Sequence, residues 1–147
     1  ATFGETFHIH KFRTMIPESE SASPGEDATR ITPLGSFLRR THLDEAPQLW
    51  TILVGKMSVV GPRAAWTEEE QLIEKDLANW RKRWFVKPGL TGLAQVEKAS
   101  SLSPETKLRY DVQYIRERSL WLDVQIVLRQ LWFVFDDVYK SLRQAWT

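Results

Sequence analysis

The sequence has no cysteine and no long apolar run, and its charges nearly cancel. The absence of cysteine excludes disulfides and thiolate metal sites, and it fits a reducing compartment. No segment approaches the roughly 20 apolar residues that cross a bilayer, and Ala1–Thr6 lacks the pattern of a signal peptide. The formal net charge of +1 gives no overall field that favours nucleic acid, so we expect no nucleic-acid partner.

The 147 residues are enough for one folded domain, which would bury roughly two-thirds of its unfolded surface. Thr6–Arg13 alternates like a strand, with His8 and His10 on its polar face. Several later segments carry apolar residues at helical spacing. The predicted fold class is therefore α+β, a single small mixed domain over residues 1–147. It would place several amphipathic, membrane-interface helices around a short sheet or hairpin.

Two of the predicted helices begin after Thr32 and at Thr67. Thr32 is interpreted as an N-cap with Pro33 at the first helical position. Thr67–Glu70 has the pattern of a capping box that opens a longer helix. The inward stripe of the first helix is predicted to be Leu34, Phe37 and Leu38, and the second would present Ile73, Leu77, Trp80 and Trp84 on one continuous face.

The second half begins with Lys87–Gly92, a predicted loop that leads into a short strand through Val96. Ser103 and Pro104 start another helix. The last segment, Leu120 to about Leu142, is a predicted amphipathic helix with one face on the core and other residues against lipid. The inward residues of the earlier helix are Leu108, Val112 and Ile115, and the main stripe of the last one is Leu120, Val124, Val127, Leu128, Leu131, Phe135, Val138 and Leu142.

Two adjacent carboxylates, Asp44 and Glu45, lie where a helix is predicted to begin. Asp44 is interpreted as its N-cap because Pro47 then falls in the first turn, where a missing N–H costs little, and Gly55 supplies the stop. A carboxylate at the positive pole of the helix dipole should stay ionised near neutral pH. Beside bound phosphates such a group can act as a nucleophile or a metal ligand, and two neighbours can divide these roles.

An isolated Asp-Glu pair is more often a simple helix cap with a first-turn acid. Here Arg39 and Arg40 lie just upstream and Gly61–Arg63 follows downstream, so we favour a site for phosphate and a divalent metal. Basic and aromatic residues also gather at Trp80–Lys87. For that region a solvated helix end and contact with membrane headgroups are both open interpretations, and stacking of single-stranded nucleic acid is a third that we do not favour.

Five motifs in order resemble the bacterial sugar transferase family, the monotopic phosphoglycosyl transferases that begin polysaccharide and glycoconjugate assembly on a polyprenol carrier. The resemblance runs from about Phe7 to about Phe135, and five motifs with close spacing are hard to reach by chance. One departure is that the family usually has Pro-Arg-Pro where this chain has Pro62-Arg63-Ala64. The motifs are Lys11–Met15, Arg30–Thr41, His42–Trp50, Met57–Arg63 and Lys87–Val96.

The resemblance implies that Asp44 is the nucleophile, which attacks the sugar-bearing phosphorus of a UDP-sugar, expels UMP and carries the phosphosugar. Polyprenol (undecaprenyl) phosphate would then accept the sugar phosphate. Glu45 would be the ligand of Mg²⁺, which neutralises charge in the transfer. Lys11, Arg39 and Arg63 match basic phosphate-contacting positions, and the planar fork of arginine can bond two phosphate oxygens at once.

Further residues are implied as contacts to the substrate, with a structural alternative for most of them. For Gly89, Thr91 and Gln95, an ordinary turn is an equally open interpretation. For Asp111 and Tyr114, on the helix predicted after Ser103, a structural hydrogen bond explains the pair equally well. The predicted substrate-binding residues are Arg13, Gly89, Thr91, Gln95, Asp111 and Tyr114.

The resemblance also implies partners and a location. The partners would be a UDP-sugar, polyprenol phosphate and a membrane surface, at the cytoplasmic face of the inner membrane. A membrane-embedded helix would precede the segment studied, so we expect this chain to be a catalytic domain without its anchor. Two other functions could use the same residues. A Mg²⁺-dependent UDP-sugar phosphohydrolase would use water as acceptor, and a non-catalytic membrane-binding module would bind vesicles without turnover.

Overall fold

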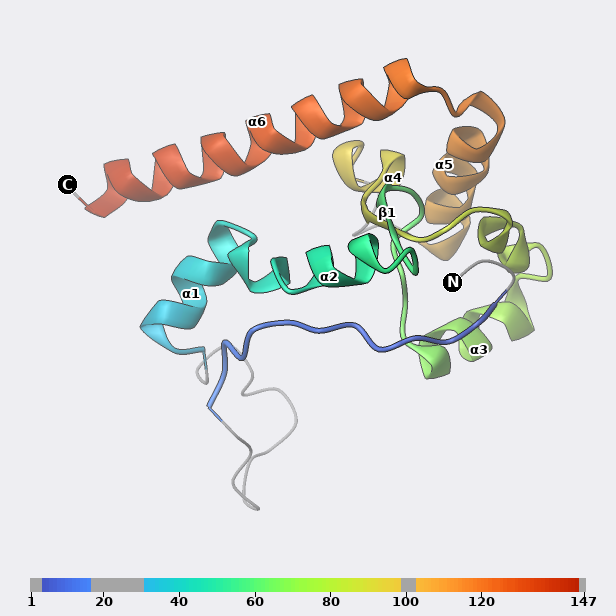
Figure 1. The fold of residues 1–147 in the computed structure, drawn as a ribbon, viewed down its shortest axis with the longest axis horizontal. Coiled ribbons are helices and arrows are strands. Elements are labelled where there is room, and N and C mark those ends of the chain that lie inside the picture. The colour runs from blue at the N-terminus through green and yellow to red at the C-terminus, as the bar shows by residue number, and fades with distance from the viewer. Residues whose placement is uncertain (1–3, 17–30, 99–102, 146–147) are drawn as a thin grey trace. The chain divides into compact units, whose positions relative to one another are not determined.

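The computed structural model describes residues 4–16, 31–98 and 103–145 (Figure 1). Strands β1 (Ser58–Val60) and β2 (Gly89–Thr91) form a parallel pair, with Ser58 opposite Gly89. This mixture of helices and a short sheet confirms the predicted α+β class. The α-helices are α1 (Pro33–Arg40), α2 (Gln48–Leu53), α3 (Thr67–Asp76), α4 (Leu93–Val96), α5 (Pro104–Glu117) and α6 (Leu120–Ala145), and the 3₁₀ helices are η2 (Leu43–Glu45) and η3 (Trp80–Phe85).

The chain divides into two compact units. Unit 1 comprises Ala1–His8 and Trp50–Trp132, and unit 2 comprises Ile9–Leu49 and Phe133–Thr147. The sheet and helices α3, α4 and α5 belong to unit 1, whereas α1 and η2 belong to unit 2. Helices α2 and α6 contribute residues to both.

The core of unit 1 forms around the strand pair, where α5 packs against η3 and α4. Its two most completely buried large side chains are Trp80 and Ile126, each 1% exposed. The chain needs glycine where the strands meet, since a Cβ on Gly89 would lie 2.1 Å from the backbone nitrogen of Gly61. Other buried apolar side chains are those of Met57, Val60, Val86, Leu93, Val96 and Leu108.

In unit 2, α1 packs on the chain at Thr14. The predicted cap is confirmed, because Thr32 Oγ1 accepts a hydrogen bond from Gly35 N at 2.9 Å. The predicted inward stripe is wrong at two positions, since Leu34 is 68% and Phe37 51% exposed. The helix instead approaches Thr14 through Gly35, where a Cβ would lie 2.0 Å from the Thr14 carbonyl oxygen. Backbone proximity, not apolar spacing, therefore selects the packed face of α1.

The predicted strand at Thr6–Arg13 does not form. The described chain is irregular there, and Phe12 N donates one backbone hydrogen bond, to Asp44 O at 2.9 Å. A strand requires a ladder of such bonds, which period-2 spacing alone cannot supply. The strand predicted through Val96 is also misplaced. β2 ends at Thr91, and the amides of Gln95 and Val96 both bond the Gly92 carbonyl to close α4.

The long helix predicted from Thr67 through Trp84 is two elements. Helix α3 ends at Asp76, Leu77 leaves the helical region at φ −127° and ψ 83°, and η3 follows. The capping box is also wrong, because α3 is preceded by Trp66 without a side-chain cap bond. The Glu70 carboxylate does not cap the helix start because it accepts hydrogen bonds from Trp80 and Arg83 of η3 instead.

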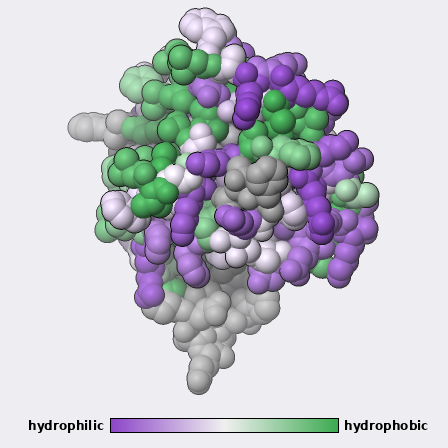
Figure 2. Space-filling model, turned by 45° about the vertical axis from the view of Figure 1, so that its right-hand side comes forward, coloured by the Kyte–Doolittle hydropathy of each residue, from purple (hydrophilic) through white to green (hydrophobic). Residues whose placement is uncertain are grey.

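Helices α5 and α6 begin as predicted. Ser103 Oγ caps α5 by accepting from Thr106 N, and Leu108 is buried while Val112 and Ile115 are half-buried. Helix α6 is amphipathic, but Ile126, outside the predicted main stripe, is its buried residue. Much of that stripe is exposed, and apolar patches reach the surface in Figure 2. The stripe residues more than 55% exposed are Leu120, Leu128, Leu131 and Phe135, and the side chain of Leu142 lies outside the described ones.

Within the described residues, no helix combines the length and apolar character needed to cross a membrane.

We expect Gly35→Ala to destabilise the protein by about 1–3 kcal/mol, because the added methyl group overlaps backbone atoms of Thr14 that cannot rotate away. Leu34→Ala on the same helix is the control, since that side chain is largely exposed and alanine favours helix. Urea unfolding of both variants measures the difference. Equal stability of the two variants would show that α1 does not pack through Gly35.

Candidate active site

The acidic pair lies in the 3₁₀ turn η2. His42 precedes it in the left-handed conformation at φ 55°, and Glu45 N bonds the His42 carbonyl at 3.2 Å. Asp44 is therefore not the N-cap of α2, which begins at Gln48, and the prediction from the helix dipole does not apply. The predicted stop is confirmed, because Gly55 follows α2 at φ +76°.

The two carboxylates differ in exposure and in partners. Asp44 is half-buried, whereas Glu45 is only 8% exposed. Lys11 Nζ donates to Glu45 Oε1 at 2.8 Å. Because Phe12 N also bonds the Asp44 carbonyl, the segment that carries Lys11 is fixed along η2. A basic residue far from the acids in sequence is thus brought directly beside them.

Arg39 comes from the last turn of α1, which packs against η2. Its Nε donates to Thr14 Oγ1 at 2.8 Å, and Thr14 is 6% exposed. A bond through Nε orients the guanidinium while its two terminal nitrogens can serve another acceptor. Arg13, also predicted as a substrate contact, is exposed in the same unit.

In unit 1 the turn that carries Arg63 is fixed by three hydrogen bonds. Gly61 N donates to Thr91 O and Gly89 N to Pro62 O, each at 2.9 Å. The third comes from a terminal nitrogen of Arg83, which donates to the Arg63 carbonyl at 2.7 Å. The structure therefore brings the predicted phosphate residue Arg63 together with the predicted contacts Gly89 and Thr91.

Gln95 combines a satisfied and an unsatisfied polar atom. Its Nε2 donates to Leu90 O at 3.4 Å, while Oε1 is the buried side-chain atom that lacks a hydrogen-bond partner among the described residues. Since buried acceptors are normally paired, this oxygen is an exception among the described side chains. Thr91 Oγ1, in contrast, donates to Gln130 Oε1 at 3.3 Å.

Asp111 is engaged by a buried guanidinium. Arg83 Nε donates to Asp111 Oδ2 at 3.1 Å, and the side chains are 6% and 3% exposed. Burial raises the pKa of Asp111 to about 6, and the nearby Arg83 charge opposes that rise. Arg83 also donates to Glu70 Oε1 at 2.9 Å and lies 4.3 Å from the ring centre of Trp80. These contacts support the structural alternative for Asp111.

Tyr114 is also engaged within the fold. Its hydroxyl lies 2.9 Å from Asp123 Oδ1 and 3.2 Å from Val60 O. Burial, followed by the hydrogen bond to Asp123, raises the pKa of Tyr114 above its ordinary value. Sequence reasoning missed Asp123 as its partner and Glu70 as the partner of Arg83. No periodic signal marks either pair, because each joins two separate helices.

The predicted site residues thus fall into one set in each unit. The unit 2 set has the acidic pair with three cations, and the unit 1 set has one cation with loop and helix residues. The first set is Lys11, Arg13, Arg39, Asp44 and Glu45, and the second is Arg63, Gly89, Thr91, Gln95, Asp111 and Tyr114.

The donor set of η2 suits Mg²⁺ in the form that phosphate-handling sites use. Mg²⁺ is usually held by one or two carboxylates, with water and substrate phosphates completing its six oxygens. Glu45 and the adjacent half-buried Asp44 supply such carboxylates. The described residues contain no group of three or more histidine, cysteine or acidic side chains that could hold a metal.

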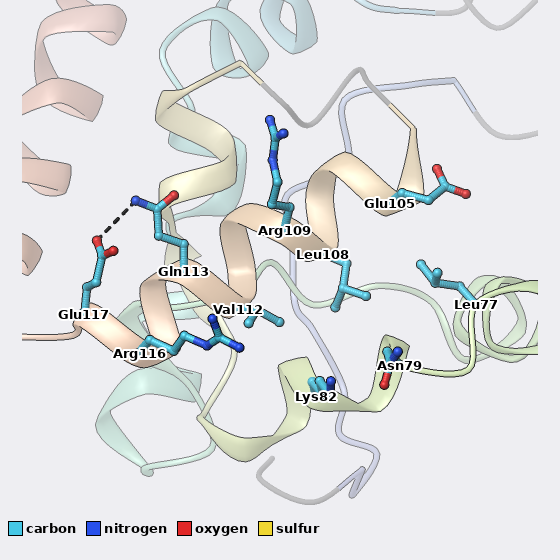
Figure 3. Close-up of a pocket in the computed structure, with 10 residues that line it drawn as sticks. All are labelled: Leu77, Asn79, Lys82, Glu105, Leu108, Arg109, Val112, Gln113, Arg116 and Glu117. Atoms are coloured by element: carbon cyan, nitrogen blue, oxygen red, sulfur yellow. Dashed lines mark hydrogen bonds between the residues drawn. The ribbon is translucent and has the colours of Figure 1, made fainter.

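Two hollows on the described surface of unit 1 differ in their relation to the predicted site residues. One, of about 420 Å³, lies between η3 and α5 and contains none of the predicted site residues (Figure 3). Leu108 and Val112 form its apolar side, and Lys82 and Arg116 are among its cations. The other, of about 520 Å³, has Tyr114 in its wall.

The acidic turn beside Lys11 and the turn that carries Arg63 contain the residue types that phosphate-handling sites commonly use. The chain belongs to the bacterial sugar transferase family, whose model matches residues 1–137.

Several of its relatives carry the name UDP-glucose:undecaprenyl-phosphate glucose-1-phosphate transferase, among them the two that follow. The one from Xanthomonas campestris pv. campestris is 41% identical over 134 residues, covering 85% of this chain and 28% of the relative. The one from Caulobacter vibrioides is 38% identical, covering 86% of this chain and 50% of the relative. An uncharacterized sugar transferase, EpsL, from Bacillus subtilis is 38% identical, with coverages of 84% and 60%. The chain therefore spans between about a quarter and three-fifths of the length of these relatives.

Asp111→Asn should change how stability depends on pH. Because burial raises the pKa of Asp111 from its ordinary 3.8 to about 6, the folded state holds this proton more tightly than the unfolded chain. The stability from this group is full below about pH 4 and is lost as pH rises through about 6. As the pH rises from about 4 to above 6, we expect the free energy of unfolding of the native protein to fall by about 2–3 kcal/mol relative to that of the variant. Urea unfolding measures this difference. The exposed Asp76→Asn is the control, and equal pH slopes for all three proteins would contradict the prediction.

Proposed function

We propose that this chain transfers a sugar-1-phosphate from a UDP-sugar to polyprenol phosphate and releases UMP, through a covalent intermediate on Asp44. The observation that carries the proposal is the η2 turn, in which Lys11 lies 2.8 Å from Glu45 and the neighbouring Asp44 is half-buried. The names of the relatives describe a sugar-1-phosphate transfer to undecaprenyl phosphate, which supports the same reaction class.

The first step forms a bond between an Asp44 carboxylate oxygen and the sugar-bearing phosphorus. The bond from that phosphorus to the bridging oxygen breaks, and UMP leaves with the electron pair. In the second step a phosphate oxygen of the polyprenol phosphate attacks the same phosphorus. The polyprenol-diphosphate sugar forms, and Asp44 is regenerated as a carboxylate. The bond from Phe12 N to the Asp44 carbonyl holds the backbone of the nucleophile in place throughout.

Lys11, Arg39 and Arg63 are the proposed phosphate contacts. Arg39 can direct its terminal nitrogens at a phosphate because Thr14 holds its Nε. Arg63 contributes from a turn whose carbonyl is held by Arg83. Glu45 would hold Mg²⁺, which supplies charge neutralisation at the phosphate oxygens when bound. Lys11 lies beside Glu45 and adds positive charge at the same place.

Membrane contact at the cytoplasmic face of the inner membrane is part of the proposal, because the acceptor is a lipid. Exposed apolar and aromatic side chains along α6 are the feature that supports it. Trp121 is 70% and Trp132 65% exposed, and tryptophan suits the headgroup layer.

The roles of the two acids can be separated by their variants. Asp44→Ala should abolish UMP release from a UDP-sugar alone, because no phosphosugar-enzyme can form. Glu45→Ala should keep the nucleophile but lose most of the Mg²⁺-dependent rate, at least about 100-fold, since metal neutralisation is worth several kcal/mol. Mass spectrometry of the native protein with UDP-sugar should find a phosphosugar adduct on the peptide that contains Asp44.

Glu68→Ala, an exposed acid of α3, is the control and should leave both measurements unchanged. UMP release that survives in Asp44→Ala would reverse the assignment. If water supports turnover as fast as polyprenol phosphate does, the protein is a UDP-sugar phosphohydrolase instead. An inactive protein that binds vesicles would be a membrane-binding module.

Binding to anionic vesicles should depend on α6. We expect Trp121→Ser with Leu128→Ser to reduce co-sedimentation several-fold, because both side chains are exposed and apolar. Leu72→Ser on α3, 62% exposed, is the control for loss of an exposed leucine. High salt should weaken the binding that remains, since each basic residue near the surface contributes about 1 kcal/mol. No binding of the native protein at low salt would rule out this surface.

A further inference from the structure

The 520 Å³ hollow lies in unit 1 where the end of η3, strand β1 and the turn from α5 to α6 meet. Its wall includes Val60, the residue directly before the Gly61–Arg63 turn. Lys87, two residues before the predicted substrate contact Gly89, is also among its lining residues. Residues that line the hollow are therefore close in sequence to Arg63 and Gly89 of the unit 1 set. The cations that line the hollow are not among the predicted site residues.

Two cations, Lys87 and Arg118, belong to this hollow. In the part of the chain that the structure describes, neither makes an ion pair or a side-chain hydrogen bond. Arg129 and Lys140, in contrast, are paired with Glu97 and Asp136. The acid in the wall of the hollow is Asp123, and one of its oxygens already lies 2.9 Å from the Tyr114 hydroxyl. The lining residues of the hollow therefore include two cations and one partly satisfied carboxylate, an excess of positive charge.

The edge of the same hollow is apolar and faces water. Phe85 is 64% and Leu120 82% exposed, and Trp121 follows at 70%. A single exposed apolar residue is ordinary, but apolar side chains beside two cations form an amphipathic site. Its chemistry suits a ligand with one anionic head and a long apolar tail. A phosphate monoester carries a charge of about −1.5 to −2 near neutral pH, which matches two cations.

We propose that this hollow is the acceptor subsite, where Lys87 and Arg118 hold the phosphate of a lipid-linked phosphate monoester. The apolar chain leaves across Phe85 and Leu120 toward the membrane. This inference rests on the proposed function and extends it, because it assigns the lipid phosphate to cations other than Lys11, Arg39 and Arg63. A nucleotide diphosphate would gain nothing from the apolar edge, so the donor stays assigned to Lys11, Arg39 and Arg63.

The two half-reactions separate the subsites. In Lys87→Gln with Arg118→Gln, we expect UMP release in the first turnover with UDP-sugar alone to stay within about twofold of the native protein, since that step needs no acceptor. The KM for polyprenol phosphate should rise about 10- to 100-fold, because charge-assisted hydrogen bonds to the phosphate are lost. Each single variant should show part of this rise.

Lys82→Gln with Arg116→Gln is the matched control. It removes the same charge from the other hollow of unit 1 (Figure 3), and it should leave the KM for the acceptor unchanged. The acceptor is presented in neutral detergent without anionic lipid, so a response that appears only with anionic vesicles would assign Lys87 and Arg118 to membrane headgroups and overturn the proposal. An unchanged KM, or an equal loss in the first turnover, would overturn it too.

Binding of a short-chain polyprenol phosphate, followed by tryptophan fluorescence, tests the subsite without turnover. We expect the Lys87→Gln, Arg118→Gln protein to bind at least about tenfold more weakly than the control variant, with thermal unfolding showing that both are folded. Unchanged binding would reject the subsite even if the protein is active. If the variant does not bind polyprenol phosphate and the native protein binds it but releases no UMP, the proposed transfer is rejected. The subsite for the lipid phosphate is then still supported.

Discussion

A guanidinium that is almost fully removed from water needs an acceptor for each of its donors, and Arg83 finds its acceptors on three separate segments. Asp111 on α5, Glu70 on α3 and the carbonyl of Arg63 all accept from it, while Trp80 lies against its flat face. Breaking any one of these contacts would leave charge or dipole buried without a partner. The geometry of the Arg63 turn in unit 1 therefore depends on a residue that touches no substrate in the proposed reaction.

Unit 2 reaches its arrangement by a different route, through close backbone approach rather than a buried charge. Gly35 lets α1 approach Thr14, and Thr14 in turn orients Arg39. The bond between Phe12 and Asp44 then fixes the segment that carries Lys11 along the acidic turn. Small residues and backbone bonds thus place the long, charged side chains of Lys11 and Arg39, which stay exposed.

Three local signals predict the structure correctly, whereas the caps predicted at Asp44 and Thr67 do not form. Thr32 with Pro33 and Ser103 with Pro104 start helices, and Gly55 ends one, because caps and backbone dihedrals act over a few neighbouring atoms. Periodic signals failed where a distant partner decides. The helix expected through Trp84 breaks at Leu77 because the carboxylate of Glu70 gathers Trp80, Trp84 and Arg83 onto a separate 3₁₀ turn.

The sequence by itself determined the α+β class, the order of the motifs and the membership of the bacterial sugar transferase family. It also allowed the residues of the candidate site to be predicted, because the type and order of residues in a motif do not depend on where helices and strands begin and end. Only the tertiary structure decided that the acids occupy a 3₁₀ turn beside Lys11 and that Asp111 pairs with Arg83. The physical reason is that a contact between residues tens of positions apart depends on how whole segments pack, and no pattern within one segment records it.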